Sequence, residues 1–158
     1  MTELQFEQIA SLISADKHQA IANMANLSSW IYNTLENINW AGFYLWTGKE
    51  LVLGPFSGKI ACTTIKIGKG VCGTALEQNK SQLVPDVHTF PGHIACDTAS
   101  NSELVVPLYI GDKPIGVLDI DSPILNRFDT EHQTFFEKVS KCLMNACGVE
   151  IAKLVGNM

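Results

Sequence analysis

The chain has 158 residues, of which 46% are hydrophobic and 17% charged, with a net charge of −5 at pH 7. This length can bury one sizeable core without disulfide or metal staples, so we expect a single domain over residues 1–158. The acidic balance without any basic cluster argues against nucleic-acid binding, and no apolar run is long enough to cross a bilayer.

The N-terminal stretch MTELQFEQIASLI lacks the basic start and the apolar run of a signal peptide. We therefore expect a cytoplasmic protein, in which thiols are kept reduced. The chain has five cysteines, and an odd number fits free thiols better than a structural disulfide framework.

The first half of the chain predicts two helices and a strand hairpin. Apolar side chains recur at helical spacing over residues 3–13 and again over residues 17–37. The aromatic segment at residues 40–46 is typical of a strand and ends at a Thr-Gly turn. Residues 50–56 are its expected hairpin partner.

The second half predicts short strands around a glycine-rich turn. In chain order we expect a strand at 62–67, a turn and short helix at 67–80, a strand at 81–87, a polar loop at 88–102, strands at 103–110 and 114–121, and a helix from 129. Hairpin-linked strands make the sheet mainly antiparallel, with helices on one or both faces. The predicted fold class is α+β.

Cys96 lies in the polar, small-residue loop PGHIACDTASNSE, where a thiol has little packing to do. A free thiol has a pKa of about 8.5, so reactivity at neutral pH needs local stabilisation of the thiolate or an acid partner. The alternative is an incidental surface cysteine. Cys142 and Cys147 lie on the apolar stripe of the last helix and are expected to pack in the core.

Cys72 lies where a glycine-rich turn enters a helix, in GKGVCGTA. Free N–H groups there would stabilise an anion, either a ligand carboxylate or a thiolate, although Cys72 also fits as a small buried filler. Cys62 opens an expected strand, and only the fold can bring it near another thiol. A zinc site from these cysteines with His93 is not favoured, because the paired short spacings of structural zinc sites are missing.

Asp119 and Asp121 lie two residues apart in an expected strand, so both point to the same face of the sheet. Adjacent carboxylates raise one another's pKa, which creates a candidate proton donor, and Glu103 joins them if the hairpin register permits. A solvated polar face is the alternative. Trp40 and Tyr44 also share one face of a strand, where they line a pocket or pack in the core.

Taken together, IGKGVCGTA, GHIACDTASNSE and GVLDIDS resemble the signature of the free methionine-(R)-sulfoxide reductases, which are stand-alone GAF-domain enzymes of the cytoplasm. The resemblance runs from about Trp40 to Phe128 and implies a GAF-like fold, an antiparallel sheet between helices. It implies no bound cofactor or metal, and thioredoxin as the external reductant. A homodimer through the terminal helices is compatible with it.

The resemblance also implies a role for each cysteine of the motif. Cys96 would attack the sulfoxide sulfur of free methionine (R)-sulfoxide, and a sulfenic acid would remain on Cys96 when methionine leaves. Cys62 would resolve the sulfenic acid as a disulfide, which thioredoxin would reduce. Cys72 would be an auxiliary or alternative resolving thiol.

The remaining roles implied by the resemblance concern acid catalysis and substrate binding. Glu103 and Asp121 would protonate the sulfoxide oxygen, and Asp119 would mainly bind the substrate. Trp40 and Tyr44 would form an apolar wall for the S-methyl group. The α-carboxylate would meet the backbone N–H groups of Gly70, Val71, Cys72 and Gly73.

Two other readings stay open on the residues alone. One is a non-catalytic GAF-type sensor that binds a small ligand, since fold by itself does not imply chemistry. The other is a thiol redox switch that responds to peroxide.

Overall fold

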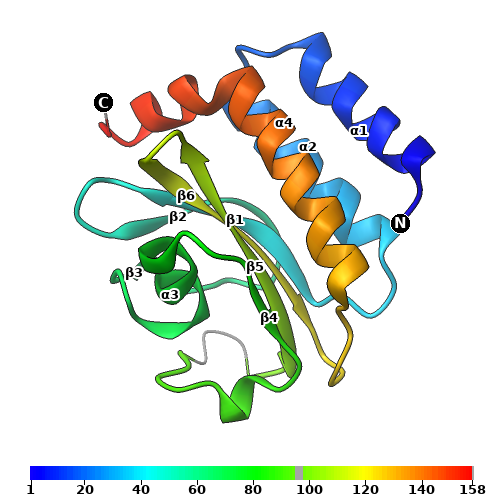
Figure 1. The fold of residues 1–158 in the computed structure, drawn as a ribbon, viewed down its shortest axis with the longest axis vertical. Coiled ribbons are helices and arrows are strands. Elements are labelled where there is room, and N and C mark those ends of the chain that lie inside the picture. Colours follow the sequence, from blue (N-terminus) through cyan, green and yellow to red (C-terminus); the bar gives the residue numbers. More distant parts are fainter. Residues whose placement is uncertain (95–97, 158) are drawn as a thin grey trace.

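The computed structural model describes residues 1–94 and 98–157, and its centre is a six-stranded antiparallel sheet (Figure 1). The strands lie in the order β3-β2-β1-β6-β5-β4. Their bounds are Trp40–Trp46 for β1, Leu51–Gly58 for β2, Thr64–Ile65 for β3, Gln82–Val84 for β4, Ser102–Ile110 for β5 and Lys113–Ser122 for β6. The predicted α+β class is confirmed. Cys96 lies outside the described residues.

Helices cover both faces of this sheet (Figure 1). Their bounds are Glu3–Ala15 for α1, Ala20–Thr34 for α2, Gly70–Gln78 for α3 and Thr130–Leu154 for α4. Helices α1, α2 and α4 lie on one face, and the short α3 lies on the other. In the described part of the chain, no helix combines the length and apolarity that a membrane span requires.

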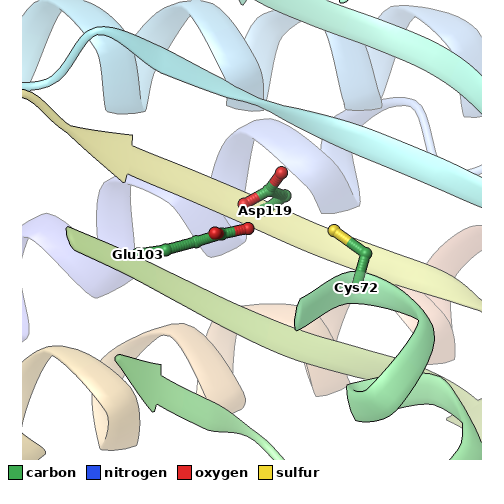
Figure 2. Close-up of side chains that lie close together, drawn as sticks. All are labelled: Cys72, Glu103 and Asp119. Carbon is green, nitrogen blue, oxygen red and sulfur yellow. The ribbon is translucent and has the colours of Figure 1, made fainter. Parts of the chain in front are cut away.

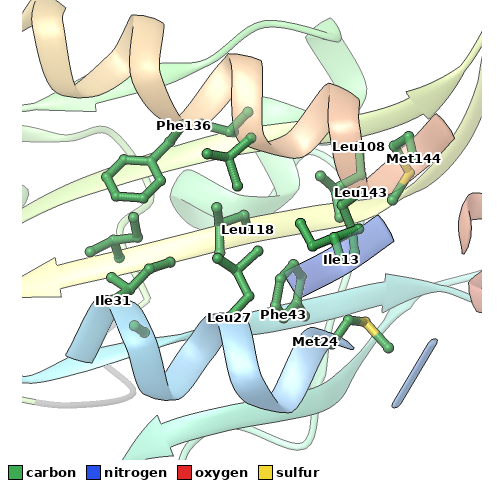
Figure 3. Packing of buried hydrophobic residues seen from close by; sticks show 14 of the residues in the cluster. Ile13, Met24, Leu27, Ile31, Phe43, Leu108, Leu118, Phe136, Leu143 and Met144 are labelled. Carbon is green, nitrogen blue, oxygen red and sulfur yellow. The ribbon is translucent and has the colours of Figure 1, made fainter. Parts of the chain in front are cut away.

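The larger hydrophobic cluster fills the space between the sheet and its three-helix layer (Figure 3). Phe43 and Leu118 point into it from β1 and β6, and meet Leu27 of α2 and Phe136 of α4. All four side chains are fully buried. Burying each such side chain contributes about 1.5–3 kcal/mol, so this cluster carries most of the stability of the fold.

A smaller cluster lies between the opposite face of the sheet and α3. Because strand side chains alternate, the residues next to Phe43 and Leu118 in sequence point to this second face. They include Tyr44 and Val117, which belong to the same cluster as Leu76 of α3. Strands β1, β5 and β6 are therefore buried over most of their length on both faces, which shields their polar side chains from water.

The elements that were predicted too long are shortened by identifiable contacts. The strand expected at 62–67 is only Thr64–Ile65, and the carbonyl of Cys62 accepts its hydrogen bond from the side chain of Tyr44 instead of a strand neighbour. The strand expected at 81–87 ends at Val84, before Pro85. The expected polar loop also contains a short 3-10 helix at Val87–Thr89.

The two N-terminal helices differ from the prediction in length and in buried face. The helix expected over 17–37 spans only Ala20–Thr34, and α1 continues to Ala15. Leu12 and Ile21, two of the apolar side chains that recur at helical spacing in these segments, are exposed. Ile9 and Ile13 are the side chains of α1 that are buried in the core cluster.

The last helix confirms the packing role of its cysteines. Cys147 is buried in the core cluster, and Cys142 is half-buried against it. The backbone at Cys147 leaves helical geometry, with φ −144° and ψ 20°, so α4 is kinked there.

Candidate active site

Pairing of β1, β6 and β5 sets three predicted site residues in one row across the sheet. Trp40 of β1 lies opposite Asp121 of β6, which in turn lies opposite Glu103 of β5. Asp119, two residues from Asp121, lies opposite Gly42 and Val105. The hairpin register therefore brings the three carboxyl groups to the same face, as the sequence predicted conditionally.

The three carboxyl side chains are buried, although the sequence also allowed a solvated face. Glu103 is 7% exposed, Asp119 5% and Asp121 9%. The alternative of a solvated polar face is wrong, because α3 and its hydrophobic cluster cover this side of the sheet. Among the described residues, Asp119 Oδ1 is buried with no hydrogen-bond partner. A buried acceptor left unmatched in this way costs free energy until a donor reaches it.

Burial favours the protonated form of the carboxyl groups in this cluster. Burial, followed by the charge of Asp121, raises the pKa of Glu103 well above its ordinary value. Burial, followed by the charge of Glu103, raises the pKa of Asp119 in the same direction. Both effects disfavour the charged form. The site therefore keeps un-ionised carboxyl groups at pH values where exposed carboxyl groups have lost their protons.

Cys72 projects from α3 toward Glu103 and Asp119 on the sheet (Figure 2). Its Sγ and one carboxyl oxygen from each of Glu103 and Asp119 all lie within 4.8 Å of one another. Burial, and then the charge of Asp119, raises the pKa of the Cys72 thiol well above its ordinary value. Of the alternatives that the sequence left open for Cys72, a buried thiol fits better than a thiolate, because burial beside acidic groups disfavours the charged form. Among the described residues, these three donors also lie close enough together to hold a metal ion.

These groups line a cavity of about 40 Å³. Its lining residues are Trp40, Tyr44, Ala61, Ile65, Lys69, Gly70, Val71, Cys72, His93, Ile94, Ser100, Glu103, Asp119 and Asp121. Trp40 stacks with Tyr44 at a ring-centroid distance of 5.9 Å and with Phe56 at 5.2 Å. The cavity thus combines an aromatic wall, Trp40 and Tyr44, with carboxyl groups that project from the same face of the sheet.

The aromatic wall also holds the chain segment that carries Cys62. The indole N–H of Trp40 donates a 3.1 Å hydrogen bond to the carbonyl of Lys59. The phenol of Tyr44 donates a 2.9 Å hydrogen bond to the carbonyl of Cys62. Burial, and then the charge of Asp119, raises the pKa of Tyr44, so its phenol keeps the proton that it donates.

The glycine-rich turn delivers the start of α3 to the cavity. Gly70 has φ +61°, which an L residue with a side chain rarely adopts, and this turn lets the chain enter the helix. Gly70, Val71 and Cys72 line the cavity, but Gly73 does not belong to its lining. The N–H of Gly73 donates within the helix to the carbonyl of Lys69. The first N–H groups of a helix have no partner within it and remain available to a ligand.

The cysteines fall into two groups. Cys62 is disulfide-bonded, whereas Cys72, Cys142 and Cys147 carry free thiols. Cys96 and the prediction that it pairs with Cys62 lie outside the described residues. The structure brings Cys72 to the carboxyl cluster, and it brings the segment of Cys62 to the aromatic wall.

Sequence reasoning missed several cavity residues. Ser100 lines the cavity and accepts a 3.0 Å hydrogen bond from the side-chain amide of Asn39. Lys69 and Ile94 also line it. His93, which was considered only as a zinc ligand, lines it too, and burial lowers its pKa. Only the position of Lys69 at the glycine turn gave any signal, because the other contacts depend on loops that come together in three dimensions.

A family model and a curated relative match this chain over most of its length. The model of the GAF domain matches residues 22–142. The free methionine-R-sulfoxide reductase of Escherichia coli K12 is 54% identical over 121 residues, which cover 77% of this chain and 73% of that protein.

Two solved structures combine strong fold similarity with sequence identity. The fRMsr of Staphylococcus aureus, in complex with substrate, superposes with a TM-score of 0.85 at 50% identity, covering 90% of this chain and 93% of that one. The free methionine-R-sulfoxide reductase of Neisseria meningitidis, in complex with its substrate, gives a TM-score of 0.86 at 38% identity, covering 94% and 88%.

Proposed function

This chain belongs to the free methionine-R-sulfoxide reductases of the GAF-domain family, and we propose that it reduces free methionine (R)-sulfoxide to methionine. It is an oxidoreductase of a cofactor-free family. The observation that carries the proposal is that buried carboxyl groups and the aromatic wall line the same cavity. A protonated acid beside an apolar wall suits a substrate whose sulfur carries both an oxygen atom and a methyl group.

In the first step, the Cys96 thiolate attacks the sulfoxide sulfur. The sulfoxide oxygen takes up a proton and is transferred to Cys96 as a sulfenic acid, and methionine leaves with its sulfur reduced. An un-ionised carboxyl group has to supply that proton, because the S–O bond of the sulfoxide breaks readily only when its oxygen is protonated. Glu103 and Asp121 are assigned to this role, and the raised pKa of Glu103 supports it.

Different residues of the cavity are assigned to different groups of the substrate. Asp119 is assigned to the substrate ammonium group, and the unmatched Oδ1 of Asp119 supports a donor arriving there. Trp40 and Tyr44 enclose the S-methyl group. The α-carboxylate meets the first N–H groups of α3, at Gly70, Val71 and Cys72, which also line the cavity. Gly73 is proposed only as support for this turn.

In the second step, Cys62 attacks the sulfenic sulfur of Cys96, water leaves, and a disulfide forms. The disulfide-bonded state of Cys62 supports its role as the resolving cysteine. Thioredoxin then reduces the disulfide by thiol exchange. Cys72, whose raised pKa makes it a weak nucleophile, serves as an auxiliary thiol.

The cellular setting follows from this chemistry. A cytoplasmic location, where dithiol reductants are maintained, is proposed together with the thioredoxin partner. We also propose a homodimer through the terminal helices, where Leu4 and Leu12 of α1 leave apolar side chains exposed.

The test is NADPH consumption with thioredoxin and thioredoxin reductase, supplied separately with the R and S forms of free methionine sulfoxide. Turnover on the R form alone, abolished by Cys96→Ser but retained by Cys142→Ser, is expected. The Cys142 variant is the matched control, since its half-buried thiol lies on α4 outside the cavity lining.

The alternatives give different results in the same assay. A small-ligand sensor would show no turnover on either form while it is folded and reduced. A peroxide switch would form its disulfide faster with hydrogen peroxide than with the sulfoxide. Either result would overturn the proposed reductase activity.

A further inference from the structure

Cys72, Glu103 and Asp119 form a compact set of three donor groups that come from three different elements. Cys72 lies on α3, Glu103 on β5 and Asp119 on β6, and one donor atom of each lies within 4.8 Å of the other two (Figure 2). With Zn–S bonds of about 2.3 Å and Zn–O bonds of about 2.1 Å, a tetrahedral Zn²⁺ holds its donors roughly 3.4–3.6 Å apart. No pair of donor atoms therefore has to close by more than about 1.4 Å to bind this ion.

The three groups are buried without a positively charged partner. Cys72 is 4% exposed, and the two carboxyl groups are buried to a similar degree. Within residues 1–94 and 98–157, no lysine, arginine or histidine forms an ion pair with Glu103 or Asp119. In the same part of the chain, Asp119 Oδ1 is buried and has no hydrogen-bond partner. A buried oxygen of this kind is stabilised by a donor or by a cation that reaches it.

The donor types favour zinc over the abundant hard cations. Zn²⁺ binds thiolate sulfur and carboxylate oxygen in one site, whereas Mg²⁺ and Ca²⁺ take oxygen ligands and need six or more of them. His93 lines the same cavity but does not belong to the group of donors that lie within 4.8 Å of one another. Three protein donors leave the fourth position of a tetrahedral ion to water.

The cavity has room for the ion and a route from solvent. Its volume of about 40 Å³ exceeds the roughly 10–15 Å³ that one water molecule needs. Lys69 and Ile94 also line the cavity and are themselves exposed, so an ion can enter beside them. Zn²⁺ with one thiolate and two carboxylates carries one net negative charge, and the ammonium group of Lys69 supplies the opposite charge in the same lining.

We propose that Cys72, Glu103 and Asp119 form an inhibitory Zn²⁺ site, which the metal and the sulfoxide substrate cannot occupy together. The ion is a competitor and not a cofactor of the reduction. On binding, it replaces the proton of the Cys72 thiol and the protons of the un-ionised carboxyl groups, which pass to water, and no atom changes its oxidation state.

The competition rests on the proposed function, whereas the metal site does not. With zinc bound, Asp119 is no longer available to the substrate ammonium group. Glu103 then holds no proton that it could donate to the sulfoxide oxygen. Zinc would therefore block both substrate binding and acid catalysis in the same cavity.

The first experiment measures metal binding without turnover. Untagged protein in the disulfide state of Cys62, free of added reductant, is titrated with Zn²⁺ by isothermal titration calorimetry, and we expect one high-affinity site per chain. Loss of a group behind a metal ligand already costs about 10–100-fold in affinity, so Cys72→Ser and Asp119→Asn should each raise Kd by at least that much. Mg²⁺ in about hundredfold excess should not displace the zinc.

Cobalt provides a signature of the thiolate ligand. Co²⁺ bound in place of zinc should give wild-type protein a thiolate-to-cobalt charge-transfer absorption, which Cys72→Ser should lack. This band is read on wild-type protein, so the test does not depend on the folding of a variant. A wild-type complex without the band would overturn the site.

Matched controls remove the same groups elsewhere. Cys142→Ser deletes a thiol outside the cavity lining, and Asp112→Asn deletes an exposed carboxylate in the turn between β5 and β6. Both variants should bind zinc with wild-type affinity. Absence of zinc binding in wild-type protein, or an equal loss in the site and the control variants, would overturn the proposal, because adventitious surface ligands would then explain the binding.

The second experiment tests competition in Cys62→Ser/Cys96→Ser, which cannot reduce the sulfoxide and keeps Cys72 in the cavity. Adding methionine (R)-sulfoxide should raise the apparent Kd for Zn²⁺ in proportion to its concentration. An unchanged Kd would overturn the exclusion. Active reductase that binds no zinc would overturn this inference alone. Zinc bound through these donors in a protein that reduces neither sulfoxide form would support the metal site and overturn the proposed function.

Discussion

The hydroxyl of Tyr44 lies 2.9 Å from the backbone carbonyl of Cys62, to which it donates a hydrogen bond. The same ring forms part of the cavity wall and stacks with Trp40. One side chain thus joins the cavity that would hold the sulfoxide to the segment that would resolve the sulfenic acid. Trp40 makes the equivalent link to Lys59, three residues earlier.

Tyr44→Phe should separate substrate binding from the second chemical step. The ring and its stacking remain, so KM for the sulfoxide should change little. The loss of the hydrogen bond leaves the Cys62 carbonyl without its donor, and we expect a stability loss of about 1–2 kcal/mol. Disulfide formation after single-turnover oxidation should slow several-fold, as followed by thiol titration in quenched samples.

Tyr109→Phe is the matched control for that experiment. Its hydroxyl also donates to a backbone carbonyl, that of Leu76 on α3, away from Cys62. It should lose a similar amount of stability without slowing disulfide formation. Equal slowing in both variants would mean that the Tyr44 hydrogen bond acts only through general stability.

Glu103→Gln should make the protein more stable and less active. The amide keeps the shape but removes a buried ionisable group, so the free energy of unfolding at neutral pH should rise by about 1 kcal/mol. Reduction of the sulfoxide should slow by roughly 10²–10⁴-fold, the usual contribution of a positioned acid. Urea unfolding and single-turnover kinetics check the two halves separately.

Leu118→Ala, one residue away from Asp119, should lower the stability of the protein without lowering its activity. Leu118 points into the helix-covered core, whereas Asp119 points to the cavity. Deleting this buried side chain should cost about 2–5 kcal/mol of stability. At low temperature, the folded fraction of this variant should reduce the sulfoxide at nearly the wild-type rate. That result would show that lower stability does not by itself lower the rate.

The contribution of Glu103 and Asp119 to the stability of the protein should fall as pH rises from acid toward alkaline values. The pKa values of Glu103 and Asp119 are raised in the folded state, so between the unfolded and folded pKa values the native protein binds more protons. The stabilisation is fully present below about pH 4, near the unfolded values, and is lost as pH passes through the folded ones. Consequently the stability advantage of Glu103→Gln should grow between pH 5 and pH 8, as measured by urea unfolding. An advantage that shrinks over this range would contradict the raised pKa.

The rate of sulfoxide reduction should depend on pH through the same carboxyl groups. As pH rises through the folded pKa of the acid, the un-ionised fraction falls, and the single-turnover rate should fall with it. In Glu103→Gln this alkaline decline should shift or disappear. A decline that is unchanged in that variant would assign the essential proton to another group.

Gly70→Ala should weaken substrate binding through the backbone. Gly70 has φ +61°, and a Cβ there would approach Ile94 at 3.2 Å, so the turn into α3 has to shift. The backbone strain is about 1–2 kcal/mol. Because the α-carboxylate is proposed to bind at this helix start, KM should rise more than kcat falls. Gly111→Ala, at φ +58° with open space around it, is the control for strain alone and should leave KM unchanged.

The residues of the candidate site were found from local patterns in the sequence, but their roles were not all settled by them. Alternation along β6 was enough to place Asp119 and Asp121 on one face, and helical spacing correctly placed Cys147 in the core. Whether Cys72 is a thiol or a thiolate stayed open, because the sequence does not reveal the acids that pack against a helix start. Ser100 was missed because only the fold brings its loop to the cavity.

The sequence by itself determined the period of each element, the glycine turn before α3 and the residue types that chemistry at sulfur requires. These are local properties, because backbone preferences and side-chain alternation act over a few residues. The burial of Asp119 and Glu103 was decided only by tertiary structure. Strand β6 inserts between β1 and β5, which brings Trp40 opposite Asp121, and α3 then closes over that face. Desolvation by these distant segments raises the carboxyl pKa values, so the acid that the reaction needs is a product of packing rather than of sequence pattern.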